Sequence, residues 1–257
     1  MPLLIGTSGW QYRHWRSTFY PRGVAQARWL EFYAARFATV ESNAAFYRLP
    51  DASTFGAWAE RTPADFVMAV KASRYLTHIL RLTAPEDPVK LLVERARHLG
   101  PKLGPILLQL PPSLPLELQR LERTLDAFPS EMRVAVEFRH ASWFTDEVRR
   151  ALEERGVALC LADRRGPVAP VWRTADWTYL RFHVGRSRPR PCYGRAALAS
   201  WVERLRACWS ADEDAYVYFN NDHRACALRD ARLFALAGRH AGWPSTRIPA
   251  ADEVRLG

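Results

Sequence analysis

The sequence predicts a single eight-stranded β/α barrel. Three observations lead to this prediction: the chain has 257 residues, short apolar runs alternate with longer segments of helical periodicity, and every apolar run ends in polar side chains. A β/α barrel typically needs about 250 residues, and such alternation is the pattern of parallel strands connected by helices. We therefore expect one domain over residues 1–257.

Eight apolar runs are expected to form the strands, and several are apolar nearly throughout, as strands covered on both faces should be. They are Leu3–Thr7, Thr39–Ser42, Phe66–Val70, Ile106–Leu110, Val134–Phe138, Val157–Ala162, Trp177–Phe182 and Ala215–Phe219. The expected helices are Ala25–Phe37, Ser53–Arg61, Pro88–His98, Leu116–Ala127, Thr145–Arg155, Arg195–Trp209 and Ala225–His240.

The sixth β/α unit departs from this pattern. Between Asp163 and Trp177 there is room only for a loop or a single turn, so we expect a missing or vestigial sixth helix. A doubly wound open sheet is the alternative architecture. It would usually carry a glycine-rich phosphate turn after the first strand, and Gly6-Thr7-Ser8-Gly9 is not GxGxxG.

Charge and cysteine usage narrow the class of protein. The net charge of +10 favours anionic partners, either a phosphorylated small molecule or nucleic acid, although an arginine-rich coding bias would give the same surplus. The four cysteines form no CxxC pair, so we expect neither a zinc site nor a disulfide. With no signal-peptide pattern and no membrane-spanning apolar run, we expect a cytoplasmic protein outside the membrane.

Polar side chains follow all eight apolar runs. Side chains two residues apart on a strand point to the same face, so these groups are expected to converge on the barrel axis. They are Ser8, Glu41 with Asn43, Lys71, Gln109, Glu137 with Arg139, Asp163, Arg181 with His183, and Asn220 with Asp222. Barrel enzymes place their active sites at this end of the strands, so we predict an active site there, with a stabilising polar plug as the alternative.

The loops above these strand ends add two features. Trp10 and Tyr12 follow the first strand, Tyr47 the second and Trp143 the fifth, so aromatic rings are expected to stack on a substrate ring or to pack the loops. The segment Gly185-Arg186-Ser187-Arg188-Pro189-Arg190 follows the seventh strand, where barrels frequently bind phosphate. It is either an anion site that includes Arg186 or a solvated basic loop.

Several ordered motifs resemble one family. They are Gly6-Thr7-Ser8-Gly9-Trp10, Val40-Glu41-Ser42-Asn43, Phe46-Tyr47-Arg48-Leu49-Pro50, Leu108-Gln109-Leu110-Pro111-Pro112, Val136-Glu137-Phe138-Arg139-His140, Tyr179-Leu180-Arg181-Phe182-His183 and Tyr218-Phe219-Asn220-Asn221-Asp222. Together with Lys71 and Thr77-His78, they resemble the YecE-like family, also called domain of unknown function 72. The resemblance implies a β/α barrel and no defined activity.

Three functional hypotheses follow from the residues. The first is an enzyme acting on an anionic substrate, in which Glu41 or Glu137 is the general base, His183 the general acid, and Lys71, Arg139 and Arg181 bind phosphate oxygens. A divalent metal among Glu41, Glu137, Asp163, His183 and Asp222 is a weaker expectation, because no close ligand motif is present. The second is a glycosidase-like hydrolase or lyase with Glu41 and Glu137 as paired carboxylates. The third is a non-catalytic nucleic-acid or nucleotide binder.

Overall fold

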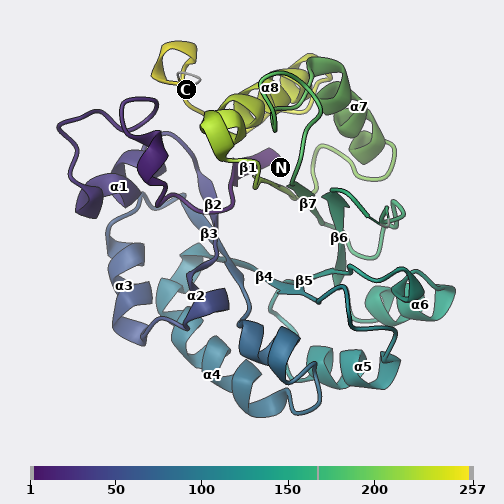
Figure 1. The fold of residues 1–257 in the computed structure, drawn as a ribbon. Coiled ribbons are helices and arrows are strands. Elements are labelled where there is room, and N and C mark those ends of the chain that lie inside the picture. Colours follow the sequence, from purple (N-terminus) through teal and green to yellow (C-terminus); the bar gives the residue numbers. More distant parts are fainter. Residues whose placement is uncertain (1–2, 167, 255–257) are drawn as a thin grey trace.

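A computed structural model describes residues 3–166 and 168–254. Its eight parallel strands form one sheet in the order β1-β8-β7-β6-β5-β4-β3-β2, which curls into a barrel with helices around it (Figure 1). The strands are β1 (Leu3–Thr7), β2 (Thr39–Ser42), β3 (Val67–Lys71), β4 (Leu103–Gln109), β5 (Val134–Glu137), β6 (Ala158–Asp163), β7 (Thr178–Phe182) and β8 (Ala215–Phe219). The eight-stranded β/α barrel is confirmed, with strand ends shifted by up to three residues from the predicted ones.

Apart from the short helix Ala44–Tyr47, which contributes to the barrel mouth, the helices lie outside the sheet (Figure 1). The helices are α1 (Trp29–Ala34), α2 (Ala44–Tyr47), α3 (Ala52–Glu60), α4 (Glu86–Ala96), α5 (Leu118–Asp126), α6 (Asp146–Glu153), α7 (Arg195–Arg206) and α8 (Cys226–His240). Between β6 and β7 the described residues form no helix, so the sixth unit lacks its helix as predicted. The short helix α2 and a π-helical turn at Tyr75–Ile79 were not predicted, because both are shorter than a recognisable helical period.

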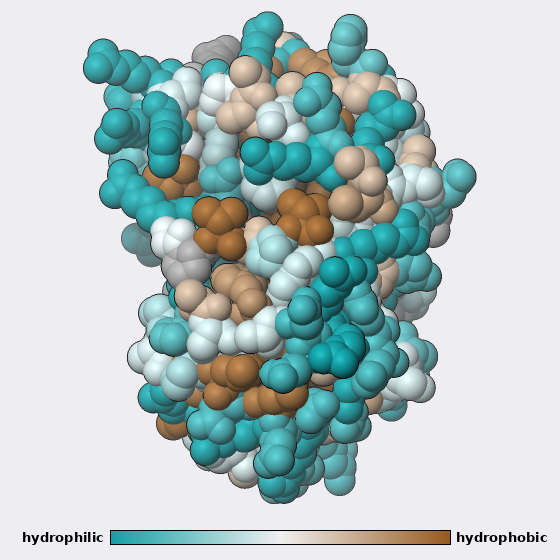
Figure 2. Space-filling model, turned by 90° about the vertical axis from the view of Figure 1, so that its right-hand side faces the viewer, coloured by the Kyte–Doolittle hydropathy of each residue, from teal (hydrophilic) through white to brown (hydrophobic). Residues whose placement is uncertain are grey.

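The strands are buried along nearly their whole length, which explains their continuous apolar runs. Each longer helix packs one apolar stripe on the sheet, and in α4 this stripe is Val89, Leu92, Val93 and Ala96. Figure 2 shows the side on which α5, α6 and α7 lie, where hydrophobic residues occur in small groups separated by hydrophilic ones. No helix in the described ranges is long and apolar enough to cross a membrane.

Side chains close the seam between β1 and β2. The Tyr33 hydroxyl accepts a hydrogen bond from the backbone N–H of Thr7 at 2.9 Å and donates one to the backbone carbonyl of Thr39 at 3.1 Å. The two backbones approach so closely at Gly6 that a Cβ there would lie 2.3 Å from the Thr39 carbonyl oxygen. Only glycine fits, so Gly6 is needed for barrel closure.

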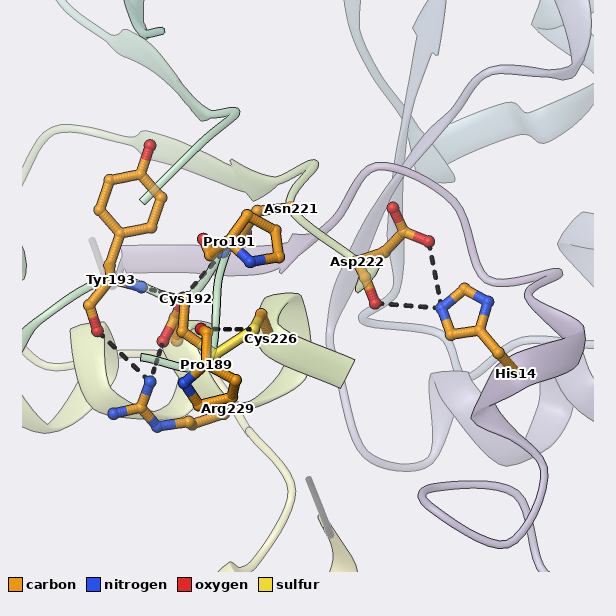
Figure 3. The surroundings of a disulfide bond; sticks show 10 residues. His14, Pro189, Pro191, Cys192, Tyr193, Asn221, Asp222, Cys226 and Arg229 are labelled. Carbon is orange, nitrogen blue, oxygen red and sulfur yellow. Dashed lines mark hydrogen bonds and ion pairs between the residues drawn. A yellow bond between two sulfur atoms is a disulfide. The ribbon is translucent and has the colours of Figure 1, made fainter. Parts of the chain in front are cut away.

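A disulfide between Cys192 and Cys226 corrects the expectation that the cysteines are unpaired. It joins the loop after β7 to the first residue of α8 (Figure 3). The two cysteines are 34 residues apart, so no local spacing signalled the pair, and only the neighbouring positions of β7 and β8 in the sheet bring them together. Cys160 and Cys208 are free.

Candidate functional site

Arg181 on β7 lies at the centre of a buried charge cluster. Its Nη2 donates to Glu41 Oε1 at 2.8 Å, and its Nη1 donates to Glu137 Oε2. The Arg181 side chain is 1% exposed and both glutamates are fully buried. Burial opposes the charge of Arg181, yet the two carboxylates outweigh it and hold the pKa of Arg181 well above its usual value. One guanidinium therefore joins strands β2, β5 and β7 across the barrel.

The two carboxylates have further hydrogen-bond partners. Tyr179 donates its hydroxyl to Glu41 Oε2 at 2.7 Å. Arg139 Nε donates to Glu137 Oε1 at 2.9 Å, and Gln109 Nε2 donates to Glu137 Oε2 at 3.0 Å. Burial alone would raise the pKa of Glu137, but Arg181, His183 and Arg139 lower it well below its usual value. All four carboxylate oxygens are thus occupied by protein donors.

Lys71, the last residue of β3, is the cation of this cluster that carries no acidic partner. Its Nζ donates to Gln109 Oε1 at 2.8 Å and lies 3.9 Å from the centre of the Phe46 ring. Within the described residues, no carboxylate oxygen lies within 4.0 Å of this nitrogen. Burial, together with the charge of Arg181, lowers the pKa of Lys71 from 10.5 to about 8.

A pocket of about 360 Å³ opens above this cluster at the carboxyl ends of the strands. We call it the mouth pocket. Its lining comprises Ser8, Gly9, Trp10, Gln11, Tyr12, Ser42, Asn43, Ala44, Tyr47, Lys71, Gln109, Arg139, Arg181 and Asn220. Most of these residues are among those that the sequence predicted for the site, since alternation along a strand decides which side chains face the barrel axis.

The rim of the mouth pocket is partly aromatic. Tyr47 is 77% exposed at its edge, whereas Trp10 is 5% exposed and packs edge-on against Trp58. Tyr12 donates its hydroxyl to the backbone carbonyl of Ser8, which also accepts from Asn43 Nδ2 at 3.1 Å. Tyr47 is therefore the ring with most surface free for stacking, while Trp10 and Tyr12 also hold the loop after β1.

Four residues that were predicted for the site do not line the mouth pocket: Trp143, Asp222, Asp163 and Arg186. Trp143 is fully buried, stacks on Phe138 and donates its indole N–H to a backbone carbonyl, so its ring does not reach the pocket. Asp222 lies 3.3 Å from His14 (Figure 3). Asp163 accepts hydrogen bonds from Tyr193 and Trp201, and together with Arg186 it lines a second pocket beside α7.

His183 is not among the residues that line the mouth pocket. Its Nε2 is 3.6 Å from Glu137 Oε1, and its Nδ1 is 3.2 Å from Asn220 Nδ2. Burial lowers the pKa of His183, against the opposing effect of Glu137, so the imidazole is neutral at neutral pH. A neutral imidazole in this position supports Glu137 and Asn220 and is not a ready proton donor.

The expected metal ligands do not converge. Glu41 and Glu137 bind Arg181, Asp222 faces His14, and Asp163 lies in the second pocket. Across residues 3–166 and 168–254, no three His, Cys, Asp or Glu side chains are grouped closely enough to hold a metal ion. The donors at the centre of the site are cationic nitrogens, which suit an anion rather than a metal.

Sequence reasoning missed some contributors. Tyr179, which binds Glu41, lies two residues before Arg181, so the alternation that placed Arg181 and His183 on one face would have found it. Phe46 was named only as part of a family motif, and its position against the Lys71 ammonium depends on the folding of α2 against β3. Gln11 and Ser42 also line the mouth pocket, but nothing in the sequence pattern distinguished them from the neighbouring residues.

Comparisons with known proteins agree with this fold. A family model described as "Protein of unknown function DUF72" matches residues 4–252. The UPF0759 protein YecE of Escherichia coli is 32% identical over 169 residues, which span 63% of this chain and 60% of YecE. The UPF0759 protein YunF of Bacillus subtilis is 26% identical over 254 residues, covering 86% of this chain and 89% of YunF.

Solved structures show the same relationship. A DUF72 family protein from Thermotoga maritima superposes with a TM-score of 0.78 at 27% identity, covering 91% of this chain and 98% of that one. One from Enterococcus faecalis gives a TM-score of 0.76 at 18% identity, covering 91% of this chain and 94% of that one, and shows the fold alone. Since the family model matches nearly the whole sequence, this chain belongs to the DUF72 family.

Proposed function

We propose that the mouth pocket is the active site of an enzyme that binds a small anionic substrate. The observation behind this proposal is the surplus of positive charge: Arg181, Arg139 and Lys71 face only two carboxylates, Glu41 and Glu137. Because both carboxylates are buried beneath the cations, the charge presented to the pocket is positive. Phosphate and carboxylate groups are the ligands that such donors recognise.

Unsatisfied polar atoms support a ligand at this place. Ser8 Oγ and Arg181 Nε are buried without a hydrogen-bond partner in the described part of the chain, and both residues line the mouth pocket. Buried polar groups are nearly always hydrogen-bonded, so these two atoms are available to bond either a bound group or water. The volume of about 360 Å³ suits a small molecule.

The paired-carboxylate mechanism receives no support from this geometry. A glycosidase needs one carboxylate free to attack or to activate water, and a second that holds a proton. Here Glu41 and Glu137 are saturated by protein donors, and Arg181 with its neighbours keeps Glu137 ionised. We therefore assign both glutamates to positioning Arg181.

Binding of matched ligands tests the proposal. Calorimetry should detect glycerol 3-phosphate but not glycerol, because only the first carries the anion. Replacing Lys71 by Met or Arg139 by Met should weaken phosphate-ester binding about tenfold or more, as expected for the loss of one charged hydrogen bond. Lys90→Met is the matched control, since Lys90 is exposed on α4 and should leave binding unchanged. Equal binding of glycerol and its phosphate would contradict the proposal.

Nucleic-acid binding is a second candidate, favoured by the exposed Arg186, Arg188 and Arg190 in the loop after β7. A polyanion neutralised by many arginines would show affinity falling steeply with salt, whereas a small phosphate ester would show a shallow slope. Tight, steeply salt-dependent binding of a short single-stranded DNA that survives Lys71→Met would favour this candidate.

A further inference from the structure

We propose that Lys71 is a reactive amine that forms an imine with a carbonyl group of the substrate, so that the substrate is a small aldehyde or ketone carrying an anionic group. This inference rests on the proposed function, because it takes the mouth pocket as the active site. It adds a nucleophile and a substrate class to that site.

The surroundings of Lys71 suit a nucleophile better than a structural cation. Its side chain is 7% exposed, so it is largely shielded from bulk water, and it lines the pocket rather than the core. No carboxylate of the described chain lies within ion-pair distance to hold it as an ammonium. The Gln109 carbonyl oxygen fixes one N–H, and the Phe46 ring covers one side of the nitrogen.

Burial and the neighbouring arginines favour the neutral amine of Lys71, against the opposing effect of Glu41 and Glu137. Burial and the charge of Arg181 lower the pKa of Lys71 to about 8, so roughly a tenth of the molecules carry a neutral amine at pH 7. An amine desolvated beside another cation is one of the ways in which enzymes activate lysine. Arg139 and Arg181 keep their charge at any accessible pH, so they can bind the anionic group while Lys71 loses its proton.

The chemistry balances without a further reagent. The neutral Lys71 nitrogen attacks the carbonyl carbon, and the carbonyl oxygen takes up protons as the carbinolamine forms and then leaves as water. Overall, the ammonium and the carbonyl compound give a protonated imine and one water molecule, with no change in oxidation state. The positive imine nitrogen then withdraws electrons from the adjacent carbon, which is the general use of lysine imines.

The other two lysines of the chain provide internal controls. Lys90 is exposed on α4, and Lys102 donates to the backbone carbonyl of Thr62 at 2.6 Å far from the mouth pocket. Neither lines that pocket. A reagent selective for an amine beside an anion site should therefore distinguish Lys71 from both within one molecule.

The test uses pyridoxal 5′-phosphate, which carries both an aldehyde and a phosphate, followed by borohydride to reduce any imine to a stable secondary amine. Peptide mass spectrometry of the whole protein should find the adduct on Lys71 at least tenfold more than on Lys90 or Lys102. Inorganic phosphate should compete with this labelling. Lys71→Arg keeps the positive charge, so it should retain phosphate binding and lose the adduct.

The two possible failures are distinguishable. Equal labelling of all three lysines, in wild-type protein that still binds inorganic phosphate in the mouth pocket, would overturn the imine inference and leave the proposed function standing. Failure of phosphate and glycerol 3-phosphate to bind at all would overturn the proposed function, and the inference with it. Labelling of wild-type protein alone decides the first question, so the test does not depend on any variant folding.

Discussion

The two ends of the barrel each place an arginine among aromatic and acidic side chains, but with opposite results. At the amino-terminal end, Arg133 pairs with Asp214, bonds the Tyr216 hydroxyl at 2.9 Å and lies over the Trp177 ring. Its side chain is 39% exposed. At the carboxyl-terminal end, Arg181 is buried between Glu41 and Glu137. One arginine caps the barrel and the other organises a pocket.

The difference lies in how the charges are matched. Arg133 pairs with one carboxylate and is partly exposed to solvent, so no net charge accumulates in the apolar barrel floor formed around Trp177, Tyr216 and Leu107. At the other end, three cations share two carboxylates and a pocket remains open above them. Closing an end of the barrel with matched charges gives stability, whereas leaving one charge unmatched in a cavity creates a binding site.

Replacing Arg181 and Arg133, one at each end of the barrel, is expected to give the largest difference in stability between the two ends. Arg181→Met leaves two buried carboxylates without their shared cation and should lower the free energy of unfolding by about 3–5 kcal/mol. Arg133→Met removes a half-exposed pair and should cost about 1 kcal/mol or less. Urea titration of both variants measures this, and equal losses would mean that Arg181 is no more important to the fold than a surface arginine.

The lowered pKa of Lys71 should make the free energy of unfolding depend on pH above about pH 8. The folded pKa of Lys71 is about 8, below the unfolded value of about 10.4, so between these pH values the unfolded state binds more protons and stability rises with pH. The burial penalty, roughly 3 kcal/mol at pH 7, is fully present below pH 8 and is relieved as pH climbs toward 10.4.

Comparing Lys71→Met with Lys90→Met isolates this effect. Wild-type protein and the Lys90 variant should gain stability relative to the Lys71 variant between pH 8 and 10.4, because only the Lys71 variant lacks the buried amine. The measurement is the free energy of unfolding at a series of pH values. Parallel curves for all three proteins would show that Lys71 titrates normally.

Replacing Tyr179 and Tyr216, one at each end of the barrel, is expected to give the smallest difference in stability. Tyr179→Phe removes a hydrogen bond to the buried charge of Glu41 and should cost about 1.5–3 kcal/mol. Tyr216→Phe removes a bond to the half-exposed Arg133 and should cost about 0.5–1.5 kcal/mol. Thermal unfolding of the two variants ranks them, and the reverse order would remove the distinction between the two ends.

Local patterns predicted much of this molecule because strands impose a strict alternation. Apolar runs located the barrel, and residues two apart, such as Arg181 and His183, were predicted to share one face, where both lie close to Glu137. Alternation predicts which face a side chain points to, but not how deeply the side chain is buried. The pattern therefore did not distinguish Glu137, which is fully buried, from Arg139, which lines the pocket. Trp143 and the Cys192–Cys226 disulfide were misjudged because their partners depend on how distant loops pack.

A crystal structure of the protein soaked with glycerol 3-phosphate would test the anion site most directly. The phosphate should lie in the mouth pocket, with its oxygens within hydrogen-bond distance of Lys71 Nζ and the Arg139 guanidinium, and the glycerol should point toward Tyr47. A phosphate bound only by the Arg186–Arg190 loop, with the mouth pocket holding solvent alone, would contradict an active site at the barrel mouth.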